Sequence, residues 1–210
     1  MPAAVPLDDL VAALVTLTVV VDPLGLVPTF IAITHGMPLR ARRQVALRAA
    51  LIAAVILAGA ALIGDWLLRA LSISLPAFRI AGGLLLFSIA SEMVFGVRIR
   101  RQSEDAEKAL DEHVRDISAF PLAIPLMAGP GAITATVLLA GRAETGTGLA
   151  LLIGVIVVVC ALCAVAFWAA GRIARLIGET ANAVLSRLLG VLLAALAVQF
   201  VVDGARAVWG

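Results

Sequence analysis

Charged residues are scarce in this sequence, and tyrosine is absent. Only 14% of the 210 residues are charged, whereas 62% are hydrophobic. An ordinary soluble domain is roughly 45–50% apolar and covers its surface with charged and polar side chains. The composition therefore excludes a soluble domain of this length, because so much apolar surface could not be hidden from water. The formal net charge of +2 is also too small to indicate a nucleic-acid partner.

The chain also lacks the residue sets on which enzymes and ATP-driven pumps depend. Its two histidines, His35 and His113, fall in or near expected loops, and no Walker-type phosphate loop is present. No cluster of metal ligands and no Ser/His/Asp set can be assembled on one side of a membrane. We therefore expect no enzymatic activity and no cofactor.

Cysteine is nearly absent as well. Cys160 and Cys163 form a C-x-x-C pattern inside an apolar run. A redox-active dithiol needs a partly exposed, electropositive setting, which such a run does not provide. We interpret both cysteines as packing residues.

What the chain does contain is long apolar runs. A helix needs about 20 predominantly apolar residues to cross a bilayer, whereas the strands of a membrane barrel alternate between apolar and polar positions. The runs are uniformly apolar, so we predict an all-α membrane protein with six transmembrane helices. These lie at about residues 10–33, 45–64, 78–97, 117–141, 145–171 and 188–205. The first run follows Asp8 and Asp9 rather than basic residues, so we expect a retained helix and not a cleaved signal peptide.

The basic residues between the runs predict the orientation, because loops on the cytoplasmic side collect Lys and Arg. Counting alternate loops, one side carries Arg40, Arg42, Arg43, Arg48, Arg98, Arg100, Arg101, Lys108, Arg115, Arg172, Arg175 and Arg187. The other side carries only Arg69, Arg79, Arg142 and Arg206. We therefore expect both termini on the outer side of the cell (inner) membrane.

An internal repeat relates the two halves of the chain. The stretch from Arg79 to Leu85 resembles the stretch from Arg187 to Leu193 at an offset of 108 residues, and Gly96 matches Gly204 at the same offset. Each half contains three expected crossings, an odd number, so the second copy must be inverted. We predict a first repeat at about 1–97, a charged cytoplasmic linker at about 98–116 and a second repeat at about 117–210.

Helices 1 and 4 are expected to be interrupted at matching positions. Asp22-Pro23-Leu24-Gly25 aligns with Gly129-Pro130-Gly131-Ala132 at an offset of 107 residues. Proline removes a helical N–H group and glycine permits an unwound backbone. Inverted repeats with interrupted helices in corresponding positions are typical of secondary transporters, which bind their substrates at such breaks.

Asp22 is the single charge in the first run. An unpaired charge at the bilayer centre is costly, so Asp22 should face the bundle interior or have a partner. One interpretation is a substrate or ion site formed by Asp22, Pro23 and Gly25. The other is a simple kink in which Asp22 caps the second half-helix.

The second break predicts an anion site. A half-helix beginning near Ala132 would direct free N–H groups and its positive dipole end toward the membrane centre. We expect Gly129, Pro130, Gly131 and Ala132 to bind a carboxylate, with hydroxyl contacts from Thr134 and its neighbour Thr136. Threonine in a membrane helix also bonds its own backbone, which is the alternative.

Two further polar residues lie on the repeat-related third and sixth helices. Ser91 aligns with Gln199 at the 108-residue offset, and Gln199 is the only glutamine in the last run, so we expect it to face protein. Both are candidate substrate contacts. An interhelical hydrogen bond is the alternative.

These motifs resemble the MarC family of inner-membrane proteins, also called the neutral amino acid transporter (NAAT) family. The resemblance covers nearly the whole chain in order, through Asp22-Pro23-Leu24-Gly25-Leu26-Val27-Pro28, Arg79-Ile80-Ala81-Gly82-Gly83, Pro121-Leu122-Ala123-Ile124-Pro125, Ala128-Gly129-Pro130-Gly131, Ser186-Arg187-Leu188-Leu189-Gly190 and Val198-Gln199-Phe200. The chain departs from the family at Leu26, where an Asn is frequent. The resemblance implies six helices in inverted repeats and, for some members, transport of small neutral amino acids such as glycine and alanine.

The leading hypothesis is therefore a secondary transporter of a small neutral solute. The expected partners are the lipid bilayer, the solute and a coupling proton or sodium ion. The rival hypothesis is a non-transporting membrane scaffold or regulator that binds a soluble partner through the 98–116 linker.

Overall fold

The computed structural model describes residues 7–98, 101, 117–143 and 145–209, and these residues form helices and short connections without any strand. Most of the expected linker at 98–116 lies outside the described residues. The elements are α1 (Leu7–Val21), α2 (Leu26–Ile33), α3 (Leu39–Ala70), α4 (Leu75–Val94), η1 (Ser118–Met127), α6 (Pro130–Ala140), α7 (Gly146–Trp168) and α8 (Ala170–Trp209).

Among the described residues, four helices are long and apolar enough to cross a membrane: α3, α4, α7 and the Thr180–Trp209 part of α8. Two pairs of shorter helices pass the same test together but are bent at a break. The bend is 45° between α1 and α2 and 58° between η1 and α6. The chain is thus a multi-pass helical protein, and its described part contains four candidate spans, or up to six if each bent pair is one span.

The basic segments that the sequence assigned to loops are largely helical. Helix α3 begins at Leu39, directly after the extended Pro38, and its first turns contain Arg40, Arg42 and Arg43. Helix α8 begins at Ala170 and contains Arg172 and Arg175, with a bend at Gly178, whose φ is 65°. Arginine is a good helix former, so helices can extend past the bilayer into their basic flanks.

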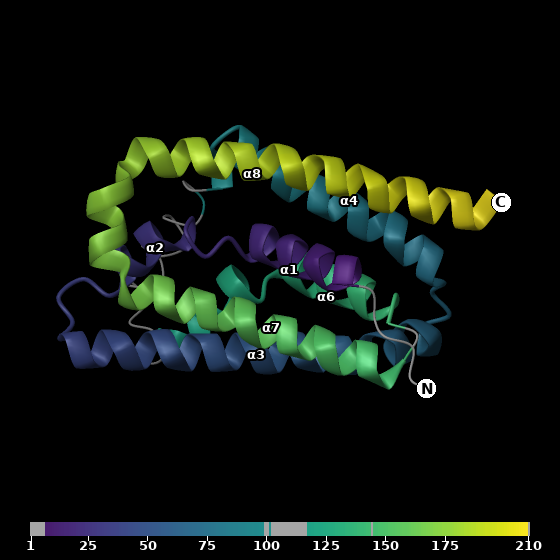
Figure 1. The fold of residues 1–210 in the computed structure, drawn as a ribbon, viewed down its shortest axis with the longest axis horizontal. Coiled ribbons are helices and arrows are strands. Elements are labelled where there is room, and N and C mark those ends of the chain that lie inside the picture. Colours follow the sequence, from purple (N-terminus) through teal and green to yellow (C-terminus); the bar gives the residue numbers. More distant parts are fainter. Residues whose placement is uncertain (1–6, 99–100, 102–116, 144, 210) are drawn as a thin grey trace.

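The long helices run side by side along the longest axis of the molecule (Figure 1). Helix α4 packs antiparallel against residues 190–204 of α8, α3 packs against α7, and α1 packs against α6. Small residues permit the closest approaches. A Cβ atom on Gly83 would lie 2.7 Å from the carbonyl oxygen of Ala197, and one on Gly190 would lie 3.1 Å from that of Ala90. Close backbone packing of this kind is a common means of holding helices together in membranes.

The outward faces of the spans are apolar and exposed. Only 28–39% of the most apolar window of each span is buried inside the protein. Large side chains such as Val55, Leu62, Leu84 and Val157 are exposed on these faces. Contiguous apolar surface of this extent is stable only against lipid tails, which confirms the membrane location.

Replacing Gly83 with alanine should destabilise the α4–α8 packing. The added Cβ would collide with the backbone of α8, and such overpacking typically costs about 1–3 kcal/mol. The matched control is Gly59→Ala on α3, where nothing lies within 4 Å of the added atom. Thermal unfolding in detergent should show a lower midpoint for Gly83→Ala and no loss for Gly59→Ala. Equal midpoints for the two variants would contradict the packing described.

Candidate functional site

Asp22 forms the junction between the two half-helices of the first bent pair. Its backbone adopts a left-handed conformation with φ of 55°, which Asp tolerates better than most residues, and its N–H group donates to Thr18 O at 2.9 Å. Its side-chain Oδ1 accepts a 2.9 Å hydrogen bond from the N–H group of Gly25. Asp22 therefore ends α1 with its backbone and caps the start of α2 with its buried carboxylate. This contact agrees with the capping interpretation, with the bonded N–H group belonging to Gly25, the residue that precedes α2, and it leaves a role in ion binding open.

The residues around Asp22 explain why the break occurs here. Pro23 follows it directly, and a Cβ atom on Gly25 would overlap the Asp22 carboxylate. Pro28 lies at the third position of α2, where the backbone N–H group would have no helical acceptor. The break predicted at residues 22–25 is confirmed.

The second break lies between η1 and α6. Within η1 the backbone is extended at Phe120 and Ile124, each of which precedes a proline, as expected from the crowding that proline imposes on the preceding residue. Gly129 is extended and caps α6, and Pro130 is the first residue of this helix. The start of the half-helix is thus two residues earlier than the predicted Ala132, because proline is already suited to the first helical position.

The N-terminus of α6 has no side-chain cap. The first described backbone bond there runs from Ile133 N to Gly129 O at 3.0 Å. Because the N–H groups of the first turn have no acceptor within their own helix, those of Gly131 and Ala132 remain available to a ligand.

A cavity of about 250 Å³, which we call the Arg98 cavity, opens at this helix terminus. Its lining combines the second break with α1, α4 and the residues that follow α4: Val20, Leu85, Ser88, Ile89, Glu92, Arg98, Arg101, Pro125, Leu126, Met127, Gly129, Pro130, Gly131 and Ala132. All four residues predicted at the second break, Gly129 to Ala132, line this cavity.

Arg98 is the cationic residue that the sequence interpretation missed, because it was assigned to a loop. Its Nη2 donates to Val20 O at 2.9 Å, near the C-terminal end of α1, and its Nη1 lies 3.1 Å from the sulfur of Met93. The chain turns back toward α1 at Gly96, whose φ of 73° is typical of the residue that ends a helix. That glycine signals in the sequence that the chain turns after α4, but it does not show that Arg98 reaches Val20.

Glu92 and Arg101 form a charged pair on the same cavity. Arg101 Nη1 lies 3.0 Å from Glu92 Oε1, and the Glu92 side chain is about one-quarter exposed. The Arg98 cavity therefore presents two guanidinium groups, a carboxylate and free helix N–H groups to one small volume.

Asp22 opens onto a different cavity, which we call the Asp22 cavity, of about 320 Å³ between α1, α7 and α8. Asp22 and Pro23 both line it, together with apolar residues such as Leu162 and Val165. Leu24 and Ile173 also line a neighbouring cavity of about 330 Å³ that extends along α2 to Gly178 and Asn182. Arg98 lies near enough to Asp22 for their charges to interact, although no ion pair or hydrogen bond joins the two side chains among the described residues.

The remaining candidates lie away from both cavities. Thr134 is buried against Gly82 of α4, and Thr136 is fully buried with no hydrogen-bond partner for its hydroxyl among the described residues. Ser91 donates to its own helix at Phe87 O, 2.9 Å away.

Gln199 is exposed, and the expectation that it faces protein is wrong. It donates a 2.6 Å hydrogen bond to Asp203, which in turn pairs with Arg142 at 3.3 Å. The buried face of α8 is formed by Leu193, Ala197 and Phe200. Gln199 lies outside this face of the helix.

Comparison with known proteins identifies the family of membrane proteins to which this chain belongs. The model of the MarC family of integral membrane proteins matches residues 7–209, and the chain belongs to this family. It is 37% identical over 190 residues to a UPF0056 membrane protein of Methanocaldococcus jannaschii, covering 89% of this chain and 91% of that protein. It is 36% identical over 194 residues to the UPF0056 membrane protein YhcE of Escherichia coli, covering 90% of this chain and 88% of that protein. No solved structure matches the chain.

Two substitutions of Asp22 should separate its capping role from its charge. Asp22→Ala removes the acceptor for Gly25 and disfavours the left-handed backbone, with an expected loss of about 2 kcal/mol of stability. Asp22→Asn keeps an acceptor oxygen and tolerates the same backbone, so its thermal midpoint in detergent should stay close to that of the wild type. If both variants unfold at the wild-type temperature, the cap does not stabilise the junction.

Proposed function

We propose that the protein is a secondary transporter of a small zwitterionic solute, such as glycine or alanine, across the cell inner membrane. The observation that carries this proposal is the Arg98 cavity. A helix N-terminus, the guanidinium of Arg98 and the paired charges of Glu92 and Arg101 meet there in a volume suited to a small molecule. Pockets for drug-sized ligands typically measure about 300–1,000 Å³, so a cavity of about 250 Å³ favours a solute with a short side chain.

The carboxylate of the solute would bind at the N-terminus of α6. The N–H groups of Gly131 and Ala132 donate to it, and the positive end of the helix dipole favours its charge. Arg98 adds a charge-assisted hydrogen bond, which is stronger than one between neutral groups. The ammonium group of the solute would pair with Glu92 across the same cavity.

Asp22 would serve the coupling ion, either a proton or sodium. It is 4% exposed, has one carboxylate oxygen bonded to Gly25, and lines its own cavity at the first break. Arg98 interacts with Asp22 and lines the solute cavity, so the charge on Asp22 affects the guanidinium that would bind the solute. This arrangement provides a physical route for coupling between ion and solute.

Two inverted repeats, at about 1–97 and 117–210, would provide alternating access by moving against each other. The packing supports this organisation. The Arg79 side chain lies against Gly204, and the Arg187 side chain lies against Gly96. At the 108-residue offset, Arg79 corresponds to Arg187 and Gly96 corresponds to Gly204. Each contact is therefore the repeat-related copy of the other, as expected when a two-fold axis in the membrane plane relates the repeats.

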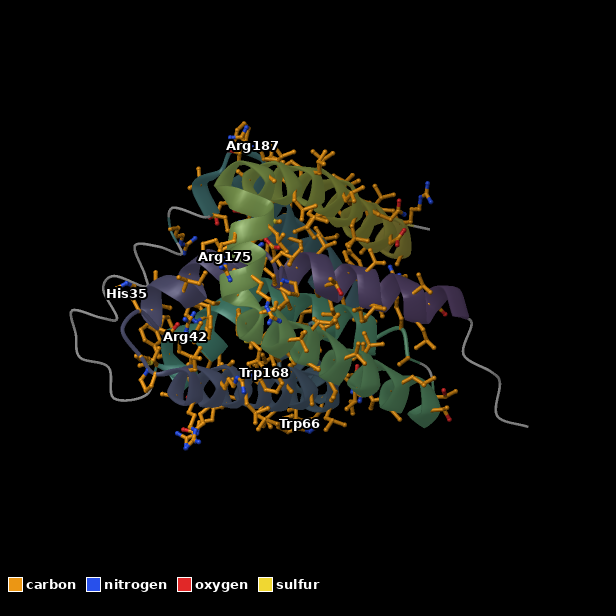
Figure 2. The ribbon with its side chains drawn as sticks, turned by 60° about the vertical axis from the view of Figure 1, so that its left-hand side comes forward. His35, Arg42, Trp66, Trp168, Arg175 and Arg187 are labelled. Carbon is orange, nitrogen blue, oxygen red and sulfur yellow. The ribbon has the colours of Figure 1, made fainter. Side chains whose placement is uncertain are left out.

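The basic end of the molecule would face the cytoplasm. Arg42, Arg175 and Arg187 lie toward the end at which α3 begins and α7 ends (Figure 2). The C-terminal end of α8 lies at the opposite end (Figure 1), which agrees with a C-terminus on the outer side.

Uptake into liposomes tests the proposal. We expect purified protein to take up labelled glycine or alanine, with stimulation by an inward proton or sodium gradient. Arg98→Gln should lower uptake at subsaturating solute by about tenfold or more, because it removes a charged hydrogen bond to the carboxylate. Asp22→Asn should abolish the stimulation by the gradient.

The matched control is Arg69→Gln, which removes an arginine that is exposed and pairs with Asp65 far along α3. It should transport as the wild type does. Absence of uptake by folded wild-type protein would refute the transport proposal. Wild-type uptake by both Arg98→Gln and Asp22→Asn would refute the site.

A further inference from the structure

Four arginines converge on one cavity at the end of the molecule where α3 begins and α7 ends. The cavity measures about 380 Å³. Arg42 and Arg43 reach it from the first turns of α3, and Arg172 and Arg175 reach it from the first turns of α8. Figure 2 shows Arg42 and Arg175 on these two elements, with Trp168 close by.

No ion pair among the described residues involves these four arginines. Arg42 lies over the ring of Phe30 at 5.6 Å, and Arg175 Nε donates to Gly171 O at 3.0 Å within its own helix. Like charges held around a shared cavity repel one another unless an anion lies between them. The arrangement therefore favours an anionic ligand with several acceptor oxygens.

We propose that this cavity binds the phosphate-bearing head group of an anionic phospholipid. Planar guanidinium groups match phosphate oxygens with paired hydrogen bonds. Basic pockets between transmembrane helices on the cytoplasmic side are suited to anionic lipid head groups. The site is separate from the Arg98 cavity and does not depend on which solute is transported.

The rim of the cavity indicates a lipid rather than a soluble phosphate. Trp168 is 54% exposed there and donates its indole N–H to Arg43 O at 3.4 Å. Tryptophan with an exposed ring and a bonded N–H is typical of the boundary between head groups and lipid tails. Leu39, also on the rim, is 71% exposed and offers a contact for an acyl chain.

The head-group site is connected to the first bent pair through aromatic contacts. The rings of Phe30 in α2 and Phe167 in α7 are stacked with their centroids 4.5 Å apart. Phe167 lines the cavity, and Arg42 lies over Phe30. A lipid that orders Arg42 and Phe167 would therefore stabilise the position of α2, the half-helix that Asp22 caps.

Titration of the purified full chain in detergent with phosphatidylglycerol, followed by thermal unfolding, tests this proposal. Phosphatidylglycerol should raise the unfolding midpoint, whereas phosphatidylcholine at the same concentration should not. The double variant Arg43→Gln/Arg172→Gln should bind phosphatidylglycerol about tenfold or more weakly, because it loses two guanidinium contacts.

The control variant, Arg40→Gln/Arg48→Gln, removes the same charge from exposed positions of α3 that lie outside the cavity lining. It should respond to phosphatidylglycerol as the wild type does. Equal weakening in both double variants would overturn the proposal in favour of a diffuse surface attraction. Equal stabilisation by soluble glycerol phosphate would overturn the assignment to a lipid. If Arg43→Gln/Arg172→Gln does not stay folded without lipid, Arg43→Lys/Arg172→Lys is tested in its place. The lysine variant keeps the charge but loses the paired hydrogen bonds, so it should bind phosphatidylglycerol more weakly than the wild type.

Discussion

Backbone groups that leave a helix inside a membrane must find new partners, and this constraint governs the whole structure. Water is absent from the bilayer core, so every unsatisfied N–H or C=O group there is costly. At the first break the backbone groups find partners within the protein. The N–H group of Asp22 donates to Thr18 O, and the Asp22 side chain accepts from the N–H group of Gly25. At the second break no side chain caps α6. The free N–H groups face a cavity instead, and this asymmetry makes the second break the better candidate for a solute.

Arg98 connects the two breaks. It bonds a carbonyl at the end of α1, interacts with Asp22 and lines the cavity at α6. A guanidinium placed this way lies near a buried carboxylate and also lines the cavity at α6. Any movement of α1 relative to α6 would therefore alter both interactions together, which is what coupling between an ion and a solute requires.

Much of this organisation could be predicted from the sequence, because it depends on local chemistry. Long apolar runs predict spans, and the Pro/Gly pairs at 22–25 and 129–131 predict the breaks. The position of Arg98 could not be predicted, since it depends on the turn after Gly96 and on a contact 78 residues away. Gln199 was misplaced for a related reason. In an almost entirely apolar helix, hydrophobicity does not show which face packs against protein.

The central claim is that a small zwitterion binds in the Arg98 cavity, and protection of an introduced thiol tests it most directly. Ser88 is exposed on α4 and lines this cavity, Gln199 is exposed away from it, and the native cysteines are buried. Alanine should slow the modification of Ser88→Cys by a water-soluble thiol reagent and leave Gln199→Cys unaffected. An unchanged rate at Ser88→Cys, at alanine concentrations that support uptake, would contradict the account.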